Sequence, residues 1–173
     1  MTTSTLYTPI MEALLALLQE KCGTLFKTYS RRLVMWEQLA QSLQGGGTLI
    51  RQPALYLFDG VITADSGIIV YERTSLSVPF KREIHRSIVL YAQLPGGGSA
   101  DGIDQTTPGG DVFYPLIEAI ENALEARVEP QGALTLGGRV FHCWVEGNSF
   151  MFTGDIDPYG QGMAIIPVKI MLP

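Results

Sequence analysis

The sequence predicts an α+β fold, mainly an antiparallel sheet packed by two principal helices, in a single domain over residues 1–173. Three observations lead to this prediction. Two stretches carry apolar residues at helical spacing, several short apolar runs are bounded by turn residues, and the expected order is roughly α-β-(α)-β-β-α-β-β. A length of 173 residues suits one domain with a sizeable core.

The first expected helix is "YTPIMEALLALLQEKCG". Thr8 is its predicted N-cap, Pro9 stands where its missing N–H costs nothing, and Gly23 ends it. The second is "VFYPLIEAIENALEARV", with Asp111 as its predicted N-cap. The residues expected to face the core are Ile10, Leu14, Leu17 and Leu18 in the first helix, and Phe113, Leu116, Ile117, Ile120 and Leu124 in the second.

The strands are expected between and after these helices. "TLFKTYSRRLVMW" alternates as an edge-like strand does and leads into a short helical stretch at 36–43, while 52–60 is a compact apolar run typical of a buried strand. A last strand covers "QGMAIIPVKIMLP", where Pro167 favours an edge or a bulge. The segment 81–94 predicts a half-buried strand, with Ile84, Ile88, Leu90 and Leu94 on one face and Glu83, His85, Ser87 and Gln93 on the other.

A long loop is expected at residues 95–111. It contains six glycines and two prolines and has almost nothing to bury. Such a loop is uncommon inside a compact domain, so it is either functional or disordered in the free protein.

The segment "RVFHCWVEG" (139–147) is the densest group of reactive side chains. Successive strand residues point to opposite faces, so His142 and Cys143 cannot share a proton or a metal ion. Cys143 is interpreted as a small buried apolar residue. The predicted core face holds Phe141, Cys143 and Val145, and the predicted outward face holds Val140, His142, Trp144 and Glu146.

No pattern in the chain indicates catalysis, a cofactor or a metal ion. The two histidines form no zinc motif, and the glycine clusters at 45–47 and 96–98 lack a phosphate-binding context. "GDIDPYGQG" (154–162) begins like a calcium loop but has Ile166 at the twelfth position, so a solvated turn is expected. The sequence therefore predicts a protein that is not an enzyme, with no catalytic, cofactor-binding or metal-binding residue.

Charge and hydropathy suggest which partners to expect. The net charge of −5 and the lack of a large basic patch argue against a protein that grips DNA. Charged residues are only 17% against 46% hydrophobic, which favours self-association over a monomer with a large core. No signal peptide or membrane-spanning segment is expected, so the protein is expected to be made in the cytoplasm with its thiols reduced.

A series of motifs resembles a known family. The series is "KTYSRRLVMWEQL", "QPALYLF", "IVLYAQL", a linker, "LIEAIENAL", "TLGGRVFHCWVEG" and the terminal "QGMAIIPVKIML". It is similar to the tail terminator (tail completion) proteins of long-tailed bacteriophages, from about residue 10 to the end. The most specific parts are the "SRR…W" and "QPAL" pairing and the strand that contains His142 and Cys143.

The resemblance implies a structural virion protein with an α+β fold. Such a protein caps the tail tube as a hexameric ring and joins the tail to the head connector, so the expected partners are copies of itself, the tail tube protein and the head–tail connector or stopper. DNA passes through the ring without specific binding, and assembly takes place in the host cytoplasm. The candidate interface residues are Arg31, Arg32, Trp36, His142, Trp144 and Glu146.

Two alternatives remain open from sequence. One is a head–tail stopper, connector or other minor tail protein, which also forms rings. The other is a small hydrolase or ligand-binding domain that uses a surface pocket around His142, Trp144 and Glu146.

Overall fold

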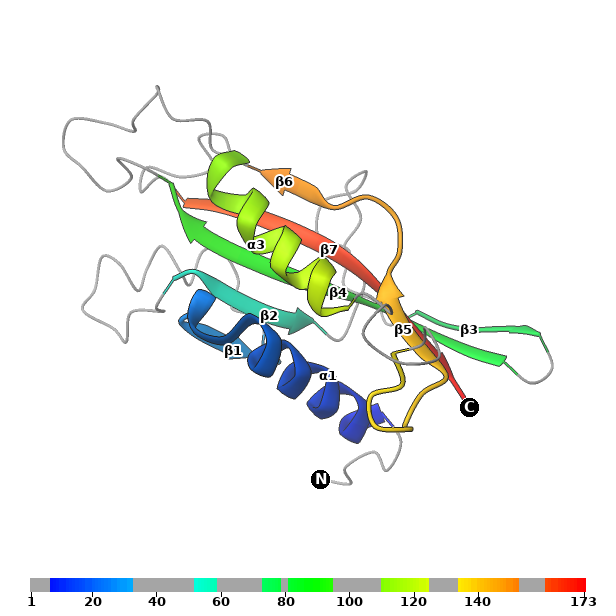
Figure 1. Cartoon of the computed structure of the whole chain (residues 1–173). Coiled ribbons are helices and arrows are strands. Elements are labelled where there is room, and N and C mark those ends of the chain that lie inside the picture. Colours follow the sequence, from blue (N-terminus) through cyan, green and yellow to red (C-terminus); the bar gives the residue numbers. More distant parts are fainter. Residues whose placement is uncertain are drawn as a thin grey trace, which may run out of the picture.

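The protein has a mixed α+β fold in which two helices pack on a mostly antiparallel sheet (Figure 1). This computed structural model describes residues 7–32, 52–58, 73–78, 81–94, 110–124, 134–152 and 161–173. The fold class predicted from sequence is confirmed.

The described elements follow one another along the chain in an order close to that predicted. The helical ones are α1 (Tyr7–Cys22), the short η1 (Gly23–Leu25) and α3 (Gly110–Ala123). The strands are β1 (Thr28–Ser30), β2 (Ala54–Phe58), β3 (Arg73–Val78), β4 (Lys81–Gln93), β5 (His142–Val145), β6 (Phe150–Phe152) and β7 (Gln161–Leu172).

The described strands form one sheet in the order β1-β2-β4-β7-β5, and the two longest, β4 and β7, lie at its centre. β3 pairs with β4, while β6 pairs with β7 on the same edge as β5. All pairings are antiparallel except that of β1 with β2. Long-range pairing of β4 with β7 therefore joins the two halves of the chain.

Both helices lie across the same face of the sheet, which we call the first face (Figure 1). Their buried residues form one core with alternate residues of the strands, as the helical spacing predicted. This core includes Ile10, Leu14 and Leu18 of α1, Phe113, Leu116, Ile117 and Ile120 of α3, and Leu124 just after α3. Leu17 is only partly buried at its margin.

The ends of the helices differ in part from the prediction. Gly23 does follow α1, with φ of +54°, a conformation that glycine adopts without strain. The N-cap assignments are wrong, because α1 already includes Tyr7 before Thr8, and α3 already includes Gly110 before Asp111. Asp111 lies in the first turn of α3, where its charge still complements the helix dipole. Gly110 and Asp111 are thus helical rather than part of the predicted loop.

The opposite face of the sheet, which we call the second face, carries a second apolar cluster. Ala54, Tyr56, Val89, Tyr91 and Ile165 form it, and all five are buried. The half-buried prediction for 81–94 is therefore wrong over the C-terminal half of β4, which is buried on both faces. Only Glu83, His85 and Gln93 keep partial or full exposure on the predicted polar face, because Ser87 is buried.

Pro167 lies in the middle of a central strand and not on an edge strand, so that prediction is wrong. Its missing N–H is tolerated because the partner strand changes there: β5 pairs with residues 168–171 and β6 with residues 163–165. The carbonyl of Pro167 accepts a hydrogen bond from the N–H of Glu146 at 3.0 Å. The proline thus occupies the gap between two short strands.

Three predicted segments lie wholly or mostly outside the described residues. These are the helical stretch at 36–43, which includes Trp36, the loop at 95–111 and the turn at 154–162.

Candidate interaction surface

The strand β5 divides its side chains between the two faces. Cys143 is fully buried in the core, and burial raises the pKa of its thiol to about 12. His142 and Trp144 are partly exposed and Glu146 is exposed. The prediction that His142 and Cys143 point to opposite faces is confirmed.

The predicted alternation fails at the start of this segment. Val140 is buried, and Phe141 is 54% exposed, the reverse of the expected pattern. The reason is that residues 136–141 form a turn and a bend, and the strand begins only at His142. Alternation holds only where the backbone is extended.

The outward side chains of β5 form a cluster with side chains from the centre of the sheet. The rings of His142 and Trp144 are stacked, with centroids 4.7 Å apart and planes at 17°. The Nζ of Lys169 lies 5.6 Å from the centroid of the Trp144 ring, within the range of a cation–π contact. Lys169 lies beside Trp144 because the two residues are direct partners in the pairing of β5 with β7.

Lys169 also makes two ion pairs. Its Nζ lies 3.1 Å from Oε2 of Glu83 and 3.2 Å from Oε1 of Glu146. The hydrogen bond with Glu83 is the main cause that raises the pKa of Lys169; the contacts with Glu146 add to it and desolvation opposes it. His85 approaches the same carboxylate, with Nε2 3.9 Å from Oε2 of Glu83. We call His142, Trp144, Glu146, Lys169, Glu83 and His85 the second-face cluster.

His142 is tied to the turn that precedes its strand. Its Nδ1 accepts a hydrogen bond from the backbone N–H of Leu134 at 3.0 Å. The neutral imidazole then carries its proton on Nε2. The ring is thereby fixed in the orientation that stacks it on Trp144.

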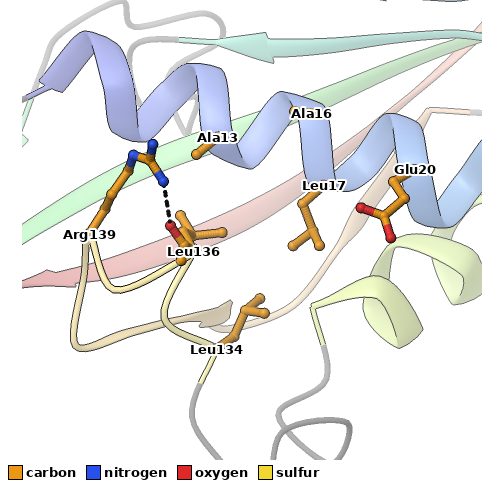
Figure 2. Close-up of a pocket in the computed structure, with 8 residues that line it drawn as sticks. Ala13, Ala16, Leu17, Glu20, Leu134, Leu136 and Arg139 are labelled. Atoms are coloured by element: carbon orange, nitrogen blue, oxygen red, sulfur yellow. Dashed lines mark hydrogen bonds between the residues drawn. The ribbon is translucent and has the colours of Figure 1, made fainter.

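A groove lies on the other side of the same turn, between α1 and residues 134–139 (Figure 2). The volume of this groove is about 390 Å³. Figure 2 shows Arg139 at one end of the groove and Glu20 at the other. Arg139 donates a hydrogen bond to the carbonyl of Leu136, with Nη1 3.2 Å from the oxygen. The remaining lining residues are Ala13, Ala16, Leu17, Leu134, Leu136 and Gly137.

The turn at the groove is strained. Leu136 has φ of +50°, and Gly137 and Gly138 follow with φ of +69° and +80°. Left-handed backbone at a leucine costs roughly 1–2 kcal/mol. The glycines of "TLGG" make the turn possible, and it positions Arg139 and the start of β5.

The predicted interface residues do not form one site. His142, Trp144 and Glu146 lie together, as the sequence indicated. Arg31 and Arg32 follow β1, at the opposite edge of the sheet, where Arg32 is exposed and Arg31 partly buried. Trp36 is outside the described residues.

Sequence reasoning missed Lys169 and Glu83. Lys169 stands between the buried Val168 and Ile170, so a lone lysine in an apolar strand was the available signal. Its partners depend on the pairing of β7 with both β4 and β5. That pairing is not readable from the β7 segment itself.

No protein-family profile matches this chain, and no curated protein is detectably similar to it. Among the described residues, no helix is long and apolar enough to cross a membrane. The same residues contain no group of three or more His, Cys, Asp or Glu side chains placed to hold a metal ion.

Proposed function

We propose that this chain is a structural virion protein, the tail terminator of a long-tailed bacteriophage. In this proposal six copies form a ring that caps the tail tube and presents a surface to the head–tail connector. The motif series carries the family assignment. The observation on the molecule that best supports an assembly role is the second face of the sheet.

The second face offers the kind of surface that a protein partner buries. The second-face cluster combines a stacked aromatic pair with charges, and Phe141, Phe150 and Phe152 are exposed in the same part of the chain. Tryptophan and other aromatic residues dominate the energetics of protein–protein contacts. This composition supports a docking surface.

The chemistry of the same residues gives little support to a hydrolase. A nucleophilic cysteine needs a lowered pKa and an adjacent base, whereas Cys143 is buried, has a raised pKa and points away from His142. Nδ1 of His142 is already occupied by the N–H of Leu134. Lys169 is held between two carboxylates.

The net charge agrees with a conduit for DNA. Each chain carries −5, so a ring of six is strongly acidic. A wall poor in cations makes few phosphate contacts, and DNA passes without being held.

To test this proposal, the purified chain is mixed with tail tubes that lack a terminator, and the mixture is examined by negative-stain microscopy. We expect a ring at one end of each tube, and restored joining when heads are added. Portal-bearing heads without tails serve as the control and should stay free of the chain.

The other outcomes separate the rival functions. Binding to portal-bearing heads and not to tubes would assign the chain to the stopper or connector class. Binding to neither would contradict any joining role and leave the alternative of a hydrolase or ligand-binding domain around His142, Trp144 and Glu146. The groove between α1 and residues 134–139 is then a second place to examine for a ligand.

A further inference from the structure

We propose that the groove between α1 and residues 134–139 binds a short extended segment of a partner protein. The segment carries an acidic side chain at one end, a basic side chain at the other, and apolar residues between them. This inference goes beyond the proposed function, because the groove includes no residue of the second-face cluster.

All residues that line the groove belong to the described part of the chain. One wall is a stripe along α1, formed by residues 13, 16, 17 and 20, which helical spacing places on one face. The other wall is the turn before β5. The volume of about 390 Å³ falls within the range of ligand pockets, roughly 300–1,000 Å³.

The middle of the groove is apolar. Figure 2 shows Leu17 of α1 and Leu134 of the turn pointing toward one another across it. Ala13 and Ala16 have side chains of a single carbon, so the backbone of a ligand can approach the helix closely there. Apolar residues of a bound segment would be removed from water between these two walls.

The two ends of the groove carry opposite charges, on Arg139 and Glu20, and both residues are exposed (Figure 2). The hydrogen bond from Arg139 to Leu136 engages one of the five guanidinium N–H groups and holds the side chain at the turn. Two other N–H groups can hold a carboxylate. Glu20 is 3.9 Å from Lys21, an exposed pair of the kind that contributes little and is easily exchanged. The groove therefore complements an acid at one end and a base at the other.

The separation of the charges sets the length of the segment. Ala13, which lies beside Arg139 in Figure 2, precedes Glu20 by seven residues, or about 10 Å along a helix. An extended chain advances about 3.3 Å per residue, so an acid and a base with two apolar residues between them match this span. A free amino acid is too short to reach both ends, and Glu20 would repel a polyanion such as a nucleic acid.

The turn that forms the second wall is fixed in the free chain. The carbonyl of Thr135 accepts the N–H of Val140 at 3.1 Å, and its Oγ1 accepts the N–H of Gly138 at 3.3 Å. Leu136 is held at φ of +50° within this turn. Strained backbone of this kind is concentrated at functional sites such as ligand clamps. A wall that is already ordered binds without the entropy cost of ordering a loop.

Two peptides of opposite direction test the groove, Ac-Asp-Leu-Leu-Lys-NH2 and Ac-Lys-Leu-Leu-Asp-NH2. Each is titrated to millimolar concentration into the isotope-labelled chain, and the amide signals of residues 134–139 are followed by NMR. We expect both the shifts and a preference of at least tenfold for one peptide, because the backbone of a segment fits the groove best in one direction. An uncharged peptide, Ac-Asn-Leu-Leu-Gln-NH2, should bind at least tenfold more weakly than the preferred one.

Arg139→Glu combined with Glu20→Lys exchanges the charges of the two ends. The double variant should prefer the other peptide, a reversal that general damage to the fold would not produce. Arg32→Glu is the matched control, because it changes the net charge as Arg139→Glu does but lies at the opposite edge of the sheet. It should keep the wild-type preference, and circular dichroism shows whether each variant is folded.

Four results would overturn the inference. In the first, neither charged peptide shifts the signals of residues 134–139 of the wild-type chain. In the second, the uncharged peptide binds as tightly as the preferred one. In the third, the folded double variant keeps the wild-type preference. In the fourth, the same signals shift with protein concentration in the absence of peptide, which would mean that a second copy of the chain fills the groove.

Discussion

Lys169 is the residue that holds the second-face cluster together. Its side chain and that of Glu83 are mostly buried, at 16% and 17% exposure. Removing one member of a partly buried ion pair leaves the other charge poorly solvated. The second-face cluster thus couples β4, β7 and β5 through one ammonium group.

Lys169→Met is therefore expected to lower the free energy of unfolding by about 1–2 kcal/mol. Methionine keeps the apolar stem and removes the charge. Denaturant unfolding followed by circular dichroism measures the change. Lys21→Met is the matched control, because Lys21 and Glu20 are exposed and 3.9 Å apart, and about 0–0.5 kcal/mol is expected there.

The same variant gives a pH test. A lysine whose pKa is raised on folding stabilises the protein fully below its ordinary value of 10.5, and this contribution is lost as pH rises through the folded value. The difference in stability between wild type and Lys169→Met should therefore be constant near neutral pH and shrink above about 10.5. A difference that persists unchanged in that range would show that packing, and not charge, is responsible.

Cys143 offers a second prediction for a single residue. Its burial and its raised pKa, about 12, keep the thiolate population negligible near neutral pH. We expect it to react with iodoacetamide at pH 8 only after unfolding. Phe141→Cys, at an exposed position two residues away, should be alkylated at once in the folded protein. Rapid alkylation of Cys143 in the native state would contradict its place in the core.

At the scale of elements, the sequence correctly predicts the helices and strands that local residue patterns determine. The inward residues of α3 repeat at helical spacing, and the buried run of β2 lies between turn residues, so both were predictable. The predictions are wrong where tertiary contacts determine whether a side chain is buried. Val89 and Tyr91 are buried in a cluster with Ala54, Tyr56 and Ile165 of the neighbouring strands, and no alternation within β4 encodes that contact.

In the candidate site, too, local patterns were predicted correctly and tertiary contacts were missed. Strand alternation separated His142 from Cys143 correctly, because β5 is extended at both residues. It failed at Phe141, where a bend precedes the strand. Lys169 and Glu83 were missed because they reach Trp144 and Glu146 only through the register of β4, β7 and β5.

The packing of α3 on β7 depends on the absence of a side chain at Gly162. A Cβ there would lie 2.6 Å from Cε2 of Phe113 and 3.2 Å from the carbonyl oxygen of Phe152. Gly162→Ala is therefore expected to cost about 1–3 kcal/mol of stability, measured by denaturant unfolding.

The double variant Gly162→Ala, Phe113→Leu distinguishes this cause from a general strand effect. Leucine leaves room for the new methyl group, so the double variant should be less destabilised than the sum of the two single variants. Strict additivity would mean that the Phe113 ring is not what opposes a side chain at position 162.

At the scale of the whole molecule, the two faces of the sheet differ in what covers them and in which side chains they expose. Its first face is covered by α1 and α3 and holds the main core (Figure 1). Its second face combines an apolar half, around Tyr56 and Tyr91, with the second-face cluster at the other end. In the proposed function, the partner contacts exposed side chains of the second face, and these can be changed without opening the core of the first face.

Trp144→Ala tests this separation. The ring of Trp144 is partly exposed, stacked on His142 and close to Lys169, so its loss removes an aromatic anchor from the second face while the core remains. Under the proposed terminator function we expect at least a tenfold loss in capping of tail tubes, equivalent to about 1.4 kcal/mol, with circular dichroism unchanged. Tyr114→Ala, an exposed aromatic residue on α3, is the matched control and should cap tubes like the wild type. Equal capping by both variants would remove Trp144 from the interface, and an equal loss in both would indicate that the partner covers more of the molecule than the second face.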